Sequence, residues 1–294
     1  MSNASLIGRT AIVTGANQGL GLAIAKEFSK AGADLAVCAR DGEKLSEAYK
    51  EIEKAKISPG QRLIAISADV SRQEDVRMII DQALHEFSAV HILVNNAGIY
   101  GPMGSIETVD WDEWKTAIEI NLFGSVLMCR AMLPHFRQNK YGKIIQVSGG
   151  GATNPMPRLE SYATSKCAIV RFIESLALDC IDDHIDVNAI SPGLLDTRLL
   201  DSVLDAGPNA VGQSFYRRML DSKEKGKCTP LETGAKLCLF LASSSSDGIT
   251  GKLISALWDD YEDWPNHIDE LQNSDLYTLR RITGRDRGKT WGDK

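Results

Sequence analysis

The segment Arg9-Thr-Ala-Ile-Val-Thr-Gly15-Ala-Asn-Gln-Gly19-Leu-Gly21, followed by a helical pattern up to residue 31, indicates the fold. The apolar run before the glycines is typical of a buried strand, and the helical pattern ends at Gly32. Glycines let the backbone approach a pyrophosphate, and the first turn of a helix offers free N–H groups to it. The segment therefore predicts a nucleotide-binding unit, with a plain tight turn as the structural alternative.

Strand-like and helical patterns alternate along the rest of the chain. This alternation predicts an α/β fold, a doubly wound parallel sheet in one domain over residues 6–256. Residues 112–134 are expected to form one long helix. The pattern weakens over 195–230, and this segment is expected to be a mobile substrate lid. The expected strands are residues 9–14, 34–40, 62–70, 91–94, 143–147, 185–190 and 250–257.

Composition excludes several function classes. The 294 residues are 43% hydrophobic and 24% charged, with a formal net charge of −6, which argues against a nucleic-acid or anionic-membrane surface. No apolar run approaches the roughly 18 residues of a membrane span. The six cysteines and five histidines show no metal-ligand spacing, so the sequence predicts no metal site. Reduced cysteines predict a cytoplasmic protein.

Two segments carry candidate adenosine contacts. In dinucleotide folds an acid at the end of the second strand binds the ribose 2′-hydroxyl, whereas an arginine accommodates a 2′-phosphate. Arg40 stands at that end here, and Asp41 follows it, which leaves both cofactors open. Asp69 ends the third strand, where it either accepts from the adenine amino group or caps a helix.

Tyr162 and Lys166 are four residues apart and therefore share one face of a predicted helix. An ammonium near a phenol favours the phenolate, so we expect Lys166 to lower the pKa of Tyr162. A tyrosine tuned in this way can donate or accept a proton near neutral pH. Ser148 follows an apolar strand and can hydrogen-bond a substrate oxygen. Asn121 lies within a predicted helix, as a satisfied core amide or a proton-relay residue.

These motifs resemble those of the short-chain dehydrogenase/reductase family over about residues 6–256. The glycine turn matches its cofactor fingerprint, Asn95-Asn96-Ala97-Gly98 its fourth-strand motif, and Pro192-Gly193 with Thr197 the segment beside the nicotinamide. The catalytic tetrad is matched in order by Asn121, Ser148, Tyr162 and Lys166. The resemblance implies a seven-stranded Rossmann-type sheet of order 3-2-1-4-5-6-7 and hydride transfer with NAD(P).

The resemblance also implies a role for each residue of the site. Tyr162 would be the general acid/base, Lys166 would hold the ribose, Ser148 would polarise the carbonyl, and Asn121 would anchor a water that links Lys166 to solvent. The implied cofactor contacts are Gly15, Asn17, Gln18, Gly19, Leu20, Gly21, Arg40, Asp69, Val70, Asn96, Ala97, Gly98, Tyr162, Lys166, Pro192, Gly193 and Thr197. NADP(H) is favoured through Arg40, although Gln18 stands where the NADP form often has a basic residue. NAD(H) is the alternative.

Several functions remain open at this point. The leading hypothesis is an NAD(P)-dependent oxidoreductase acting on a small carbonyl or secondary alcohol. The alternative enzyme is a 3-oxoacyl-thioester reductase, and the alternative from another class is an NADP-binding regulatory protein. The apolar helices 112–134 and 160–179 predict a homo-oligomer, a tetramer or a dimer.

Residues 257–294 extend beyond the last strand. They hold three of the five tryptophans and begin with a predicted aromatic cluster of Trp258, Tyr261 and Trp264. Such side chains are unfavourable in water as a group. The extension is therefore expected to pack on the domain or on a neighbouring subunit, where it either covers a sheet edge or bounds an active site.

Overall fold

A parallel sheet of seven strands forms the centre of the computed structural model, which describes residues 4–292. The strand order is β3-β2-β1-β4-β5-β6-β7, and all neighbouring strands are parallel, as the sequence predicted. The strands β1 to β7 are Thr10–Thr14, Asp34–Ala39, Leu63–Ser67, Ile92–Asn95, Gly142–Val147, Ile185–Ser191 and Leu253–Ser255.

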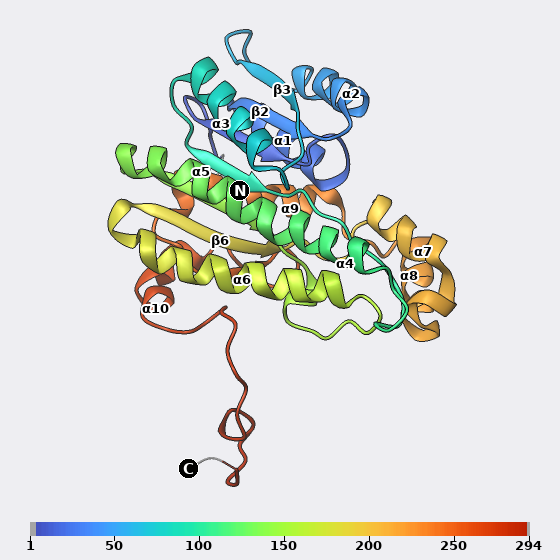
Figure 1. Ribbon diagram of the computed structural model, residues 1–294. Coiled ribbons are helices and arrows are strands. Elements are labelled where there is room, and N and C mark those ends of the chain that lie inside the picture. The colour runs from blue at the N-terminus through green and yellow to red at the C-terminus, as the bar shows by residue number, and fades with distance from the viewer. Residues whose placement is uncertain (1–3, 293–294) are drawn as a thin grey trace.

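Helices cover both faces of this sheet (Figure 1). Helices α1, α2 and α9 contribute to the apolar core on one face, and α3, α5 and α6 to the core on the other. The right-handed crossovers of a parallel sheet place helices on both faces in this way. The helices α1 to α10 are Gly19–Lys30, Gly42–Glu53, Gln73–Phe87, Trp111–Ile118, Gly124–Asn139, Glu160–Cys180, Arg198–Val211, Gln213–Glu224, Leu231–Ala242 and Ile268–Gln272.

The prediction of one helix over residues 112–134 is wrong in its details. Helix α4 passes into a π-helical turn, Glu119–Phe123, before α5 begins, and α5 continues past Pro134 to Asn139. In the π turn the Gly124 N–H donates to Glu119 O, a wider turn that often marks functional sites. The stretch from Trp111 to Asn139 is long and apolar enough to cross a membrane, but it packs on α3, α6 and the sheet as a core helix of this fold.

The weakly patterned segment 195–230 contains two helices, α7 and α8 (Figure 1). Gly207 has φ 75° and lies before Pro208, so α7 is kinked there. Gly212, with φ 86°, separates α7 from α8. These breaks interrupt the apolar period that the sequence analysis relied on, which is why the helices were not predicted.

After β7 the chain runs along the otherwise open edge of the sheet. The Leu253 N–H donates to Tyr277 O at 2.8 Å. The buried Lys252 donates through Nζ to Ser274 O at 3.2 Å and to Leu276 O at 3.0 Å. The first bond pairs a backbone N–H that the edge strand β7 would otherwise present to solvent, and the Lys252 bonds hold the extension beside that edge.

The extension also contributes side chains to both cores. Trp264 and Leu271 are buried with α1 and α9, whereas Leu279 packs against the core on the opposite face. Trp258 does not join the expected aromatic cluster, since it is 86% exposed. The chain beyond Leu279 extends away from the sheet (Figure 1), and its last two residues, 293–294, lie outside the described part.

Candidate functional site

A cavity of about 1330 Å³ opens at the carboxyl ends of the strands, the edge at which ligands bind in open α/β sheets. Ser148 lines this cavity, while Asn121 is fully buried outside its lining. The lining includes every residue predicted to contact a cofactor, namely Gly15, Asn17, Gln18, Gly19, Leu20, Gly21, Arg40, Asp69, Val70, Asn96, Ala97, Gly98, Tyr162, Lys166, Pro192, Gly193 and Thr197.

Two glycines of the turn after β1 lie where a side chain would clash with neighbouring atoms of the protein. Gly15 has φ 63°, and a Cβ built on it would lie 2.9 Å from Ala97 Cα. A Cβ on Gly21 would lie 2.3 Å from Gly15 O. Only glycine fits these two positions without moving backbone, so the turn can pack closely against itself and against the segment after β4.

Thr14 and Asn96 join the glycine turn to the segment after β4. Thr14 Oγ1 accepts the N–H groups of Asn96 and Ala97 at 3.0 and 3.1 Å. Asn96 Nδ2 donates to Thr14 O at 2.9 Å and to Gly15 O at 3.1 Å. These hydrogen bonds hold together the glycine turn and the segment after β4, and both segments line the cavity.

Helix α1 points its N-terminus at the cavity. Its N-cap residue, Gln18, has extended backbone and makes no side-chain hydrogen bond to the first turn. The N–H groups of that turn and the partial positive charge of the helix end are therefore available to an anion such as a diphosphate. Together with the glycine turn, this arrangement fits a dinucleotide cofactor.

The segment after β6 closes the cavity over the glycine turn. Gly193 has φ 88°, and a Cβ built on it would lie 2.4 Å from Thr229 Oγ1. Thr197 is the N-cap residue of α7, and its Cγ2 would lie 3.3 Å from a Cβ built on Gly19. Thr197 thus lies against the start of α1, and Gly193 lies against Thr229.

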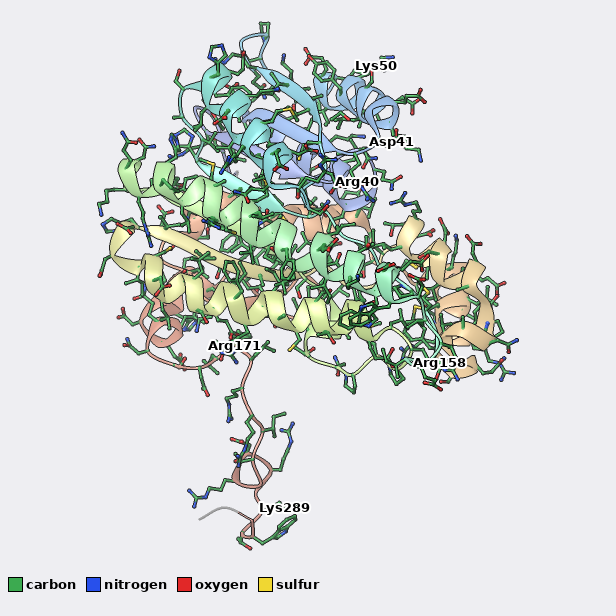
Figure 2. The ribbon with its side chains drawn as sticks, viewed as in Figure 1. Arg40, Asp41, Lys50, Arg158, Arg171 and Lys289 are labelled. Atoms are coloured by element: carbon green, nitrogen blue, oxygen red, sulfur yellow. The ribbon has the colours of Figure 1, made fainter. Side chains whose placement is uncertain are left out.

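The end of β2 presents Arg40 to the cavity. Arg40 Nη1 lies 3.7 Å from Asp69 Oδ2, and the Arg40 side chain is 53% exposed. Asp41 is the N-cap of α2, and its Oδ1 accepts the Lys44 N–H at 3.1 Å. Figure 2 shows Arg40 and Asp41 side by side at this end of the molecule. Asp69 Oδ1 accepts from Ser71 N and Ser71 Oγ in a local turn, so Asp69 does not cap α3, whose N-cap residue is Arg72. The contact of Asp69 with adenine stays a prediction.

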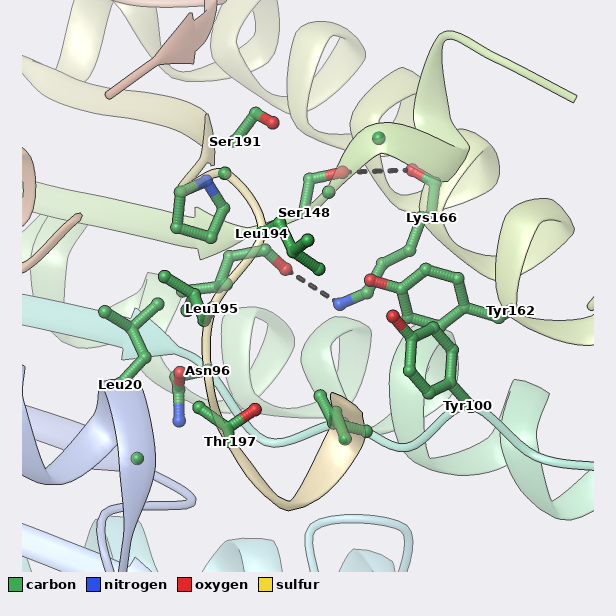
Figure 3. A pocket seen from close by; sticks show the side chains of 18 of the residues that line it. Leu20, Asn96, Tyr100, Ser148, Tyr162, Lys166, Ser191, Leu194, Leu195 and Thr197 are labelled. Atoms are coloured by element: carbon green, nitrogen blue, oxygen red, sulfur yellow. Dashed lines mark hydrogen bonds between the residues drawn. The ribbon is translucent and has the colours of Figure 1, made fainter. Parts of the chain in front are cut away.

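Tyr162, Lys166 and Ser148 meet in the cavity where α6 passes the end of β5 (Figure 3). Lys166 Nζ donates to Val147 O at 2.9 Å and lies 5.7 Å from the centre of the Tyr162 ring. Ser148 Oγ donates to Lys166 O at 3.5 Å. The Tyr162 hydroxyl lies 2.7 Å from a Cβ built on Gly149, so glycine at that position leaves the phenol accessible.

The expected lowering of the Tyr162 pKa is wrong for the protein alone. Burial raises the pKa of Tyr162 above its ordinary value of 10, and the nearby Tyr100 adds to the shift. Burial also lowers the pKa of Lys166 to about 8. Desolvation disfavours the charged form of each group. The four-residue spacing of the two groups in the sequence does not show how deeply they are buried.

Asn121 lies in the π turn and holds the segment after Gly98. Its Nδ2 donates to Ile99 O at 2.8 Å and to Ser165 Oγ at 3.0 Å, and its Oδ1 accepts from Ile99 N at 2.8 Å. The side chain is therefore a satisfied core amide. A Cβ built on Gly98 would lie 3.1 Å from Asn121 Oδ1 and 3.6 Å from Lys166 Nζ, so glycine lets Asn121 and Lys166 approach one another.

The structure adds residues that the sequence analysis missed. Tyr100 packs its ring 4.5 Å from that of Tyr162, and its place two residues after the Asn-Asn-Ala-Gly segment is the signal that could have identified it. The cavity side facing α7 and α8 is apolar, through Met156, Leu194 and Phe215 among others. The extension contributes further lining: Leu257, Trp258, Asp259, Tyr277 and Thr278.

Comparison with known proteins agrees with this geometry. The family model described as short chain dehydrogenase matches residues 9–206. Glucose 1-dehydrogenase 2 of Bacillus subtilis is 34% identical over 247 residues, 84% of this chain and 92% of the relative. 3beta-hydroxysteroid dehydrogenase 1 of Eggerthella lenta is 38% identical over 248 residues, 84% of this chain and 91% of the relative.

One solved structure is also similar to this chain in sequence and fold. It is the 3-ketoacyl-(acyl-carrier-protein) reductase from Brucella melitensis complexed with NADH, with a TM-score of 0.73 and 30% identity. The match covers 85% of this chain and 97% of that chain. The family model alone spans more than half of the sequence described here. This protein therefore belongs to the short-chain dehydrogenase/reductase family and is an NAD(P)-dependent oxidoreductase that acts on CH–OH or C=O groups of small molecules.

Proposed function

We propose that the protein interconverts a ketone and a secondary alcohol, with Tyr162 as the general acid/base. The main support for the proposal is that Tyr162 and Ser148 line the same cavity as the glycine turn after β1. When bound, the nicotinamide supplies or accepts the hydride. In the reductive direction Ser148 Oγ donates a hydrogen bond to the substrate oxygen, and Tyr162 gives that oxygen its proton.

Lys166 and Asn121 support this proton transfer in the proposal. The buried Lys166 ammonium would hold the cofactor ribose and stabilise the phenolate that Tyr162 becomes. Asn121 would position Lys166 indirectly, since its amide fixes Ile99 and Ser165. Its role as anchor of a relay water remains a prediction.

A carbonyl panel tests the proposal. The panel contains acyclic ketones, cyclic ketones, aldoses and an acetoacetyl thioester, each assayed with NADPH and NADH by loss of nicotinamide absorbance. The proposal expects turnover of a ketone. Preference for the thioester would favour the 3-oxoacyl-thioester reductase alternative. Cofactor binding without turnover of any compound would favour the regulatory alternative.

We propose that NADP(H) is the preferred cofactor. Arg40 lines the cavity at the end of β2, and its guanidinium pairs with the Asp69 carboxylate only loosely, at 3.7 Å, so it can turn to a 2′-phosphate. Asp41 is engaged as a helix cap rather than directed at a ribose. An arginine binds phosphate through charge-assisted hydrogen bonds.

Arg40→Ala is expected to reduce kcat/KM for NADPH by roughly 10- to 100-fold, the equivalent of a hydrogen bond to a charged group. The value for NADH should change little, because NADH lacks the 2′-phosphate. Steady-state kinetics with both cofactors measure this, and Lys50→Ala on the exposed side of α2 is the matched control. An equal loss of kcat/KM for NADPH and NADH would show that Arg40 only stacks on adenine.

We propose that the protein is a homodimer or homotetramer that uses the outer side of α4, α5 and α6. Trp111, Phe123 and Leu178 are 61%, 52% and 75% exposed there. Exposed apolar side chains on neighbouring helices favour an interface. Sedimentation at micromolar concentration should give a dimer or tetramer, and Leu178→Glu should shift it toward monomer. A monomeric wild-type protein would refute the proposal.

We propose that α7 and α8 form a substrate lid. Arg158, whose φ is 69°, donates through Nη1 to Asn209 O at 2.9 Å and to Ala210 O at 3.4 Å, and so ties the end of α7 to the loop before α6. Figure 2 shows Arg158 beside these helices. Hydrogen exchange over residues 198–224 should slow when cofactor and product are added. Unchanged exchange would argue for a fixed wall.

We also propose a cytoplasmic location. All six cysteines are free thiols, which suits a reducing compartment. Cell fractionation that places the native protein in a secreted fraction would contradict this.

A further inference from the structure

The family match ends at residue 206 and so assigns nothing to the extension, yet part of the extension lines the active-site cavity. Ser255 ends β7, directly beside Ser191 at the end of β6, and Ser148 N donates to Ile190 O in β6. The end of β7 is thus two strand spacings from Ser148, about 10 Å. The extension therefore begins within reach of a substrate held at Ser148.

A hydrogen-bonded turn fixes the first residues of the extension. Ser255 Oγ accepts the N–H groups of Leu257 and Trp258, both at 3.3 Å. The Asp259 carboxylate accepts the Ser255 N–H at 2.7 Å. Leu257 Cδ1 would lie 2.8 Å from a Cβ built on Gly193, so the turn contacts the segment after β6. The turn holds Leu257 and Trp258 at the cavity.

A second part of the extension returns to the same place. Tyr277 O accepts the Leu253 N–H from β7, and the Tyr277 ring packs 4.3 Å from the buried Trp264. Thr278 follows and also lines the cavity. Because β7 fixes its backbone and Trp264 supports its ring, Tyr277 is held rigidly in the wall.

These residues give the cavity an aromatic wall. Trp258 is 86% exposed and Tyr277 41% exposed, and both line the cavity. Aromatic faces of this size bind the flat or ring-shaped parts of ligands. Both side chains keep exposed surface at the cavity, where the ring of a ligand can contact them.

We propose that Trp258 and Tyr277 form a substrate subsite that selects carbonyl compounds or alcohols carrying a ring system. The subsite rests on the proposed function, because it positions the ring of a substrate whose oxygen is held by Ser148 and Tyr162. A small acyclic ketone cannot span the distance from Ser148 to this wall, whereas a ring system beside the reacting carbon can.

Steady-state kinetics with 2-decalone and 2-butanone test the subsite in the full-length holoenzyme. Trp258→Ala and Tyr277→Ala should each raise KM for 2-decalone by up to about tenfold, the scale of an aromatic contact. KM for NADPH and kcat/KM for 2-butanone should stay unchanged. Trp291→Ala is the matched control, since Trp291 is 74% exposed and lies outside the cavity lining. An unchanged KM for 2-decalone, or an equal loss of kcat/KM for both ketones, would overturn the proposal.

A binding measurement tests the substrate subsite independently of catalytic turnover. In the Tyr162→Phe variant saturated with NADP⁺, 2-decalone should change the tryptophan fluorescence. The change should persist when Trp291 is replaced by Phe and disappear when Trp258 is replaced by Phe. Persistence in the Trp258→Phe protein, or no change with Trp258 in place, would refute the subsite. A Trp258-dependent change in a wild-type protein that reduces no ketone would refute only the proposed function.

Discussion

Replacing Tyr162 with phenylalanine is expected to lower kcat by roughly 10²- to 10⁴-fold, the contribution of a positioned general acid/base. The variant removes only the hydroxyl that the proposal makes the proton donor. The phenylalanine ring keeps the packing against Tyr100, whose ring centre lies 4.5 Å away. The dissociation constant for NADPH, measured by fluorescence, should therefore stay near the wild-type value while kcat falls.

Tyr100→Phe is the matched control for this experiment. Tyr100 is a second, half-buried phenol in the same cavity, and desolvation raises its pKa too. The proposal gives its hydroxyl no role in proton transfer, so this variant should keep most of its activity. If Tyr162→Phe retained more than about a tenth of wild-type kcat, the general acid/base role of Tyr162 would be wrong.

Trp264→Ala is expected to lower the free energy of unfolding by about 3–5 kcal/mol, the usual cost of deleting a buried tryptophan side chain. Trp264 is 5% exposed and belongs to the core that α1 and α9 share with the extension. Its loss removes apolar contacts and leaves a cavity under Tyr277. Urea unfolding followed by circular dichroism measures the change, with the protein concentration held constant in case assembly contributes.

Trp291→Ala provides the control, because an exposed tryptophan outside the core should change the free energy of unfolding by less than about 0.5 kcal/mol. Similar small effects from both substitutions would show that the extension is not part of the folded core. The same result would refute the packing of residues 264–279 on the domain, whereas the chain beyond Leu279 extends away from the sheet.

The fold could be predicted from the sequence because its determinants are local. Each buried strand is a short apolar run, and the glycines after β1 mark the turn into α1. The errors fall where local patterns mislead. The kink at Gly207 and Pro208 concealed α7, and the π turn around Asn121 cannot be told from an α-helix by apolar spacing.

The residues of the candidate site could be predicted from the sequence, but the direction of the Tyr162 pKa shift could not. The motif spacings identified Ser148, Tyr162 and Lys166, which the structure brings into one cavity. The direction of the Tyr162 pKa shift depends on how much protein surrounds the phenol, which the sequence does not contain. Trp258 and Tyr277 were missed as a pair because only the β7 edge brings them to the same wall.

The central claim is that a substrate carbon exchanges hydride with the cofactor at the Tyr162 site. Reduction of a ketone with NADPH deuterated at nicotinamide C4, followed by mass spectrometry of the alcohol, measures this transfer directly. We predict one cofactor-derived deuterium on the carbinol carbon with the wild-type protein, and loss of that product with Tyr162→Phe. An alcohol that carries no deuterium from either face of the nicotinamide, or undiminished labelling in the variant, would contradict the claim.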